Sequence, residues 1–233
     1  MMKETAGSAN RVEAVERALT ILDAFAEGGE VLSLAALAQK TGLHKSTILR
    51  LAGSLQRFGY LRRDDTGHYR PGPSLWRLGN LYRRGFDLGE QIRPELRRLV
   101  EATQETASFY VKEGDERVCL YRLNSPRPIR HHLDEGIRLP IDKGAAGRVL
   151  MAFSGAKGPL HDETRARGHH ASLGERDPMI AAIAVPVLDG KGLLRGALTL
   201  SGLRARFDEA ARAEALELLR QSAGRLSAVL PVD

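Results

Sequence analysis

The chain has 233 residues, of which 42% are hydrophobic and 27% are charged, and its formal net charge is +6. This composition is typical of a soluble globular protein, and no run approaches the roughly 18 consecutive apolar residues that a membrane-spanning helix needs. The single cysteine, Cys119, excludes an internal disulfide and a cysteine-based zinc site, so we expect a cytoplasmic protein.

The N-terminal residues predict a disordered tail and then one amphipathic helix. Residues 1–10 are polar and lack the apolar core of a signal peptide. Over residues 11–27 apolar side chains recur every three or four positions, which predicts a helix that Gly28 and Gly29 end. The residues expected on its apolar face are Val12, Val15, Leu19, Leu22 and Phe25.

Two short amphipathic helices separated by a tight turn are predicted next. Ser33 can cap the first helix, and Gly42 suits the left-handed backbone position that ends it. This arrangement is typical of a helix-turn-helix, whose second helix lies in the major groove of DNA. Cations and hydroxyl donors gather at the start of that second helix, where they can contact bases and phosphates. These candidate DNA-binding residues are His44, Lys45, Ser46, Thr47 and Arg50.

A basic β-hairpin is predicted behind the second helix. Residues 59–63 and 68–70 read as two short strands around the turn at residues 64–67. A basic hairpin in this position is a wing, and its candidate DNA-binding residues are Arg62, Arg63, His68 and Arg70.

The positive charge of the chain is concentrated in this region. From His44 to Arg84 there are nine lysines and arginines but only two acids, Asp64 and Asp65, a net charge of +7. The whole chain, with 35 basic and 29 acidic residues, carries only +6. Such a local excess is the electrostatic footprint of a surface that binds phosphates, and double-stranded DNA is therefore the predicted partner.

A linker helix is predicted between two domains. Pro71, Gly72 and Pro73 break the chain, and residues 74–88 resume helical spacing with Leu75, Leu78, Leu81 and Tyr82 on one stripe. This stripe packs either on the chain's own domains or on the same helix of a second chain, because a DNA reader usually needs two half-sites. The predicted divisions are residues 1–10 (tail), 11–72 (winged helix-turn-helix), 73–89 (linker helix) and 90–233 (second domain).

The rest of the chain predicts an α+β domain with an antiparallel sheet. Helices are expected at residues 92–106, 148–153 and 208–230. Strands are expected at residues 107–111, 117–122, 129–133, 181–188 and 196–201.

With these segments in view, the chain resembles the IclR family of bacterial transcriptional regulators over nearly its whole length. The matching stretches lie at residues 15–22, 41–47, 67–73, 139–148, 167–168, 184–187 and 200–202. The resemblance implies a winged helix-turn-helix, a linker helix and a GAF-like effector-binding domain. It also implies a homodimer or dimer of dimers whose operator binding responds to a small organic or aromatic acid.

The resemblance also implies where the effector binds. Family pockets use backbone amides of a small-residue segment and two hydroxyl residues on the last strand. Carried over by position, the effector-binding residues are Leu139, Ala145, Ala146, Ser172, Ala182, Thr199 and Ser201. Ala182 stands where cysteine is common and Ser172 where an acid is common, so we expect a less polar pocket. Residues 154–163 are shorter than the usual helical connection, so a helix is not expected there.

The sequence disfavours two other classes of protein. An enzyme, for example a metabolite-binding enzyme domain fused to a DNA-binding module, would need catalytic or metal-binding residues. The histidines at 131, 132, 161, 169 and 170 lack the spacing of a metal site, and no nucleotide or nucleophile motif occurs. We therefore predict no enzyme activity, no metal and no cofactor. A purely architectural DNA-binding protein would not need a second domain of this size.

Overall fold

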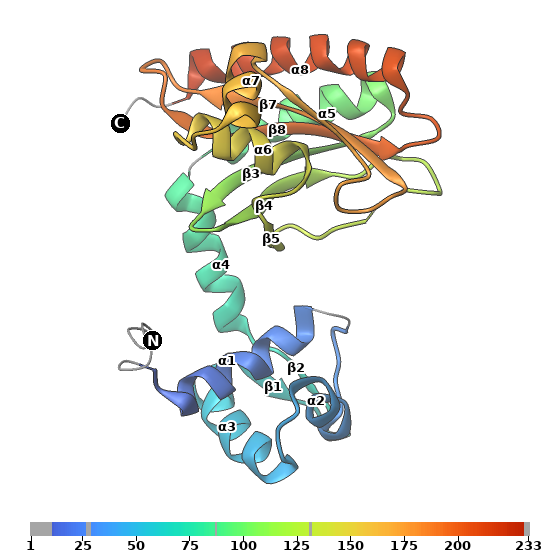
Figure 1. The fold of residues 1–233 in the computed structure, drawn as a ribbon. Helices are drawn as coiled ribbons and strands as arrows, with labels where there is room; N and C mark the ends of the chain where they lie inside the picture. Colours follow the sequence, from blue (N-terminus) through green and yellow to red (C-terminus); the bar gives the residue numbers. More distant parts are fainter. Residues whose placement is uncertain (1–10, 27–28, 87, 131, 231–233) are drawn as a thin grey trace, which may run out of the picture. The chain divides into compact units, whose positions relative to one another are not determined.

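The computed structural model describes the chain except for residues 1–10, 27–28, 87, 131 and 231–233 (Figure 1). The tail expected at residues 1–10 thus lies outside the described residues. The chain forms two compact units, residues 1–85 and residues 86–233. In the described ranges, no helix combines the length and the apolar character needed to cross a bilayer.

The first unit is a three-helix core with a two-stranded hairpin and one further helix. Its elements are α1 (Glu13–Ala26), α2 (Leu34–Thr41), α3 (Lys45–Arg57), β1 (Leu61–Arg63), β2 (Tyr69–Pro71) and α4 (Pro73–Phe86). The Ser33 hydroxyl caps α2 by accepting a hydrogen bond from the Ala36 amide (3.1 Å), and Gly42 ends the helix at φ +68°. The predicted helix-turn-helix and hairpin are therefore confirmed.

The predicted apolar face of α1 is wrong in its first half. Ile21 and Ala24 are buried in the three-helix core, and Leu22 and Phe25 pack against it. The other predicted members, Val12, Val15 and Leu19, are 61%, 53% and 53% exposed. The core of this unit contacts α1 from Ala18 onward, so the regular apolar spacing begins before the part of the helix that the core covers.

The second unit is built on a six-stranded antiparallel sheet with the strand order β5-β4-β3-β8-β7-β6. Its strands are β3 (Thr106–Glu113), β4 (Glu116–Leu123), β5 (Arg138–Pro140), β6 (His170–Leu173), β7 (Ile180–Leu188) and β8 (Leu194–Leu203). Its helices are α5 (Gly89–Thr103), α6 (Gly144–Phe153), α7 (Pro159–Arg167) and α8 (Glu209–Val229). The predicted α+β class with an antiparallel sheet is confirmed.

The sheet separates two helical layers (Figure 1). Helices α5 and α8 cover one face, where Leu96 and Leu219 join the larger apolar core. The Arg225 guanidinium of α8 pairs with the buried Glu95 carboxylate of α5 at 2.8 Å and fastens these two helices together. Helix α6 covers the opposite face, where Val149 and Leu150 belong to a second, smaller core.

Three boundaries in this unit differ from the predictions. Helix α5 ends at Thr103, and the residues up to Thr106 lead into β3. The strand predicted at residues 129–133 is wrong for the four residues that are described there, because the short edge strand β5 begins only at Arg138. The expectation that residues 154–163 lack a helix is also wrong, because α7 starts at Pro159 and ends at the left-handed Gly168.

Candidate functional site

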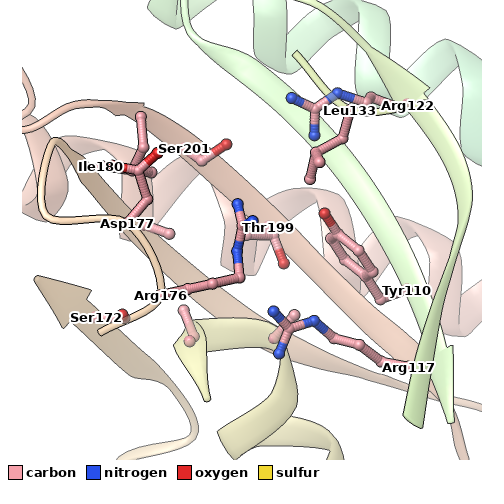
Figure 2. A pocket seen from close by; sticks show the side chains of 14 residues that line it. Tyr110, Arg117, Arg122, Leu133, Ser172, Arg176, Asp177, Ile180, Thr199 and Ser201 are labelled. Carbon is pink, nitrogen blue, oxygen red and sulfur yellow. The ribbon is translucent and has the colours of Figure 1, made fainter. Parts of the chain in front are cut away.

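A cavity lies between the start of α6 and the face of the sheet that α6 covers. Its volume is about 490 Å³ when the open solvent at its mouth is included. Figure 2 shows the side chains that surround it. The lining residues are Tyr110, Arg117, Arg122, Leu133, Gly144, Ala145, Ala146, Ser172, Arg176, Asp177, Ile180, Ala182, Thr199 and Ser201.

The first turn of α6 presents backbone N–H groups to this cavity. Ala145 and Ala146 are 2% and 4% exposed, and within the described chain their amides have no acceptor. Unpaired amides at a helix start, aided by the helix dipole, favour an anion. Helix α6 also lies unusually close to its neighbours, because a Cβ on Gly147 would overlap the carbonyl oxygen of Ile141 and the guanidinium of Arg117.

Arg117 of β4 is a buried cation at the same end of the cavity. It is 4% exposed, and one of its Nη groups donates to the Lys143 carbonyl just before α6. Its Nε has no hydrogen-bond partner in the described chain, and no carboxylate there forms an ion pair with it. Burial lowers the pKa of Arg117, but an arginine stays charged at neutral pH. A buried charge is costly unless an anion accompanies it.

The sheet supplies a polar floor. Thr199 of β8 pairs with Ser108 of β3, which in turn pairs with Arg122 of β4, so their side chains lie in one row across the sheet. Arg122 donates from Nη1 to the Ser108 hydroxyl (3.1 Å). The Thr199 hydroxyl is buried and has no partner among the described residues. Since buried polar groups are normally hydrogen-bonded, this hydroxyl indicates a missing ligand group or water.

Tyr110 and Cys119 form the neutral part of this floor. Burial raises the pKa of Tyr110 to about 12, and the neighbouring Cys119 adds to the shift, so the phenol stays protonated at neutral pH. Burial likewise raises the pKa of Cys119 to about 11. Cys119 is fully buried, as is typical of an inert structural thiol.

The loop between β6 and β7 closes one side of the cavity. Arg176 and Asp177 of this loop line the cavity. Its Glu175 carboxylate accepts a hydrogen bond from the Gly144 amide (3.0 Å) and lies 3.4 Å from both Arg148 Nε and His170 Nε2. Burial opposes ionisation of Glu175, but the Gly144 amide, then His170 and Arg148, outweigh it and lower its pKa.

The structure brings most of the residues named from the sequence to this one cavity. Six of the seven line it, and Leu139 instead lies in the core beside α6. The sequence analysis missed Arg117, Arg122 and Tyr110, and with them the positive charge of the cavity. The signal for Arg117 was available, since it lies two residues before the apolar Cys119 on a strand and so shares its buried face.

The proposed DNA contacts on α3 are accessible. His44 is the N-cap residue of α3 and Lys45 its first residue, and both side chains are exposed, as are Ser46 and Arg50. Thr47 is half-buried. None of these side chains makes an interaction with another described residue, so the start of α3 offers unengaged donors to a ligand.

Some charged side chains of the wing interact with groups of the wing's own turn. Asp64 accepts hydrogen bonds from Thr66 and His68, and the bond from the Thr66 hydroxyl contributes most to lowering its pKa. The guanidinium of Arg70 lies 3.6 Å from the same carboxylate, and Arg63 donates to the Gly67 carbonyl. Arg62 has no such partner in the described chain, which leaves it the freest cation of the wing.

The histidines do not form a metal site in the described part of the chain. No three histidine, cysteine, aspartate or glutamate side chains are grouped there in a way that could hold a metal ion. His132 pairs with Asp134 on the surface, and His170 pairs with Glu175. His131 lies outside the described residues.

Comparisons with known proteins agree over both units. The family model described as IclR helix-turn-helix domain matches residues 14–65, and that described as bacterial transcriptional regulator IclR C-terminal matches residues 81–158 and 160–228. The transcriptional regulator TtgV of Pseudomonas putida is 32% identical over 88% of this chain and 75% of its own length. XynR of Escherichia coli is 28% identical over 94% of this chain and 97% of its own length.

Solved structures show the same fold. An IclR homologue from Microbacterium hydrocarbonoxydans, crystallised with 4-hydroxybenzoate, superimposes with a TM-score of 0.76 at 22% identity, over 92% of this chain and 98% of that one. The Thermotoga maritima IclR structure gives a TM-score of 0.73 at 21% identity, over 91% and 96% of the two chains.

The carboxylate of Glu175 should stabilise the second unit only while it is ionised. Its pKa is lowered by folding, so its contribution is present above the ordinary value near 4.5 and is lost as the pH falls through the lower folded-state value. We expect Glu175→Gln to reduce the free energy of unfolding by about 1 kcal/mol at pH 7, and by little near pH 3. Urea unfolding at several pH values measures this.

The matched control is Glu163→Gln, which breaks the exposed pair with Arg167 on α7 and should change stability little at any pH. An equal loss in both variants, or a loss at Glu175 that does not depend on pH, would contradict the assignment.

Proposed function

The chain belongs to the IclR family of DNA-binding transcriptional regulators, which are not enzymes, and we propose that a small carboxylate or aromatic acid in the α6 cavity sets its affinity for operator DNA. The observation that carries this proposal is the pair of unsatisfied buried groups at the cavity. Within the described chain, Arg117 Nε and the Thr199 hydroxyl both lack a hydrogen-bond partner. A carboxylate with a second polar group would satisfy both.

The start of α6 supports the same ligand. The unpaired amides of Ala145 and Ala146 can donate to a carboxylate that also contacts Arg117, so its charge is met from two directions. The hydroxyls of Thr199 and Ser201 point to the same face of β8 and can orient the rest of the molecule. The bound 4-hydroxybenzoate of the Microbacterium relative is an acid of this class.

DNA recognition is proposed to use the start of α3 and the wing. On α3, Ser46 and Arg50 share one face and would meet bases, whereas Lys45 would meet phosphate. On the wing, Arg62 lies directly opposite Arg70 across the hairpin. Like charges placed opposite each other destabilise a hairpin, which favours a role in binding phosphates over a role in folding.

We also propose that the protein works as a homodimer or a dimer of dimers. On α4, the stripe residues Leu78, Leu81 and Tyr82 are between 42% and 55% exposed in the single chain. A stripe of exposed apolar residues at helical spacing on a linker fits the same helix of a second copy. Two copies would bring two recognition helices to the two halves of an operator.

Two arginines test the DNA interface in different ways. Arg50→Ala should weaken operator binding by about 1–3 kcal/mol and relax the preference at one base, because it removes a base contact. Arg62→Ala should weaken binding to all sequences alike and lower the salt slope by about 1, because it removes a phosphate contact. Band-shift titrations at several salt concentrations measure both.

Arg97→Ala is the control, since Arg97 is an exposed arginine of α5 in the other unit. If Arg50→Ala leaves both affinity and base preference at the level of this control, Arg50 does not read the operator.

The linker stripe is tested by Leu78→Glu. This change would place a charge in the proposed contact between two chains and should convert dimers to monomers at micromolar concentration, as measured by light scattering. Asn80→Glu, which lies on another side of α4, should leave the assembly intact. A wild-type protein that is already monomeric would reject the proposal.

The effector cavity is tested by the double variant Thr199→Val, Ser201→Ala. Losing hydrogen bonds to a bound acid should weaken its binding by about 1.5–3 kcal/mol, roughly ten- to a hundredfold. A calorimetric screen of organic and aromatic acids on both proteins measures this. Coupling between two binding sites is reciprocal. A true effector must therefore change the protein's affinity for operator DNA by the same factor by which bound operator DNA changes the protein's affinity for the effector.

An acid that binds both proteins equally well would show that the hydroxyls are ordinary core groups. A broad screen without any acid that alters operator binding would remove the support for the sensing role.

A further inference from the structure

Helix α3, the second helix of the helix-turn-helix (Figure 1), turns one side to the core and the opposite side to solvent. Ile48 and Leu51 are buried in the three-helix core, and Leu55 packs against it. Successive side chains of an α-helix are turned by about 100°, so residues 46, 49, 50 and 53 point directly away from this core. The residues on this outer side, all of them exposed, are Ser46, Leu49, Arg50 and Gly53.

Leu49 is an apolar side chain on this outer side. It is 44% exposed and therefore contributes little to the core. A single exposed leucine is ordinary on a protein surface. This one lies beside Arg50, in the N-terminal half of the helix, where a recognition helix meets base edges. The group that an apolar side chain recognises in the major groove is the C5 methyl of thymine.

Gly53 follows Leu49 one turn later, and the fold does not require a glycine there. It lies inside α3, and a Cβ placed on it would meet no atom within 4 Å in the described chain. An alanine would fit this position and would favour the helix, because glycine in a helix interior loses more conformational freedom. A glycine that folding does not require leaves room on the helix surface for a partner that approaches closely.

The chemistry around Leu49 and Gly53 fits duplex DNA. Helix α3 carries the cations Lys45, Arg50 and Arg57 and no acid, so phosphates are attracted to this helix. An α-helix with its side chains is about 10–12 Å across and the major groove about 12 Å wide, so the helix enters with little room to spare. A position without a side chain on the outer side lets it enter more deeply.

Resting on the proposed role of α3 in DNA recognition, we infer that Leu49 and Gly53 are determinants of operator specificity. Leu49 contacts the methyl group of a thymine. Gly53 lets the helix approach the floor of the groove closely enough for that contact. The polar and charged neighbours Ser46 and Arg50 then read adjacent bases from the same side of the helix.

Replacing thymine by deoxyuridine tests the Leu49 contact, because this change removes only the methyl group. The DNA probe is a duplex that the full-length protein selects from a random library. Each thymine of one half-site is replaced in turn, and dissociation constants are measured by fluorescence anisotropy. We expect one replacement to weaken binding by the wild type about three- to tenfold. In Leu49→Ala the same replacement should change binding by less than about twofold.

Leu193→Ala is the matched control, since Leu193 is a 54% exposed leucine of the second unit. This control should keep the full effect of the methyl group. The contact is ruled out if no replacement weakens binding by the wild type, or if the effect persists in Leu49→Ala. A Leu49→Ala protein that keeps its base preference but changes its molar mass in light scattering would place Leu49 between two protein chains instead.

Gly53→Ala tests the close approach, because it should move folding and binding in opposite directions. The alanine should raise the melting temperature by a few degrees. It should also weaken binding of the selected duplex roughly tenfold or more, because its methyl group occupies space that the DNA needs. Gly53→Leu, with a larger side chain that also favours a helix, should weaken binding further.

Gly224→Ala is the control for this pair. Gly224 is another exposed helical glycine, on α8, whose added Cβ would meet no atom within 4 Å in the described chain. This change should stabilise the protein without altering DNA binding. A folded Gly53→Leu protein that binds the selected duplex as tightly as the wild type overturns the close approach.

The outcomes separate this inference from the proposed function. A protein that selects one DNA sequence but tolerates the changes at Leu49 and Gly53 recognises its operator through other residues, and only the inference fails. A protein that selects no sequence from the library rejects the proposed recognition by α3 together with the inference.

Discussion

The buried guanidinium of Arg117 is the constraint on which the second unit depends. It reaches from β4 to the carbonyl of Lys143 and so fixes the first turn of α6 above the sheet. Glycine at 147 is required because any side chain there would overlap both Arg117 and the Ile141 carbonyl. The same contact that positions the helix leaves a cation and two free amides facing a cavity, so the packing of α6 and the capacity to bind an anion have one cause.

The loop after β6 brings an acidic side chain to the start of α6. Glu175 brings a carboxylate to the Gly144 amide, one residue before the amides that stay free. It thereby places a negative charge at the start of α6, and its neighbours in the loop, Arg176 and Asp177, line the cavity. The carboxylate of Glu175 at this helix start supports the proposal that the neighbouring amides receive a carboxylate.

The first unit divides its charges between folding and binding. Arg63 and Arg70 contact groups of the wing's own turn, whereas the side chains of Arg50 and Arg62 make no hydrogen bond or ion pair with another described residue. The apolar residues divide in the same way. Ile21 and Leu37 fill the three-helix core, but the start of α1 and the stripe on α4 stay exposed in a single chain. The residues that take no part in the core or in the wing's own contacts are therefore cationic on the wing and α3, and apolar on α1 and α4.

The sequence by itself determined the local features. Ser33 and Gly42 set the ends of α2, the charge of residues 44–84 predicted a DNA-binding surface, and alternation along β8 placed Thr199 and Ser201 on one face. Each of these follows from contacts within a few residues, which spacing and backbone preference encode directly.

Only the tertiary structure decided what depends on partners distant in the chain. Whether Val15 of α1 is buried depends on how far the small core extends, and it does not reach that position. The role of Arg117 depends on the Lys143 carbonyl, 26 residues away, and that of Glu175 on the Gly144 amide, 31 residues away. Periodicity shows that a side chain faces inward, but the order of the strands and the position of α6 on the sheet determine which groups it contacts there.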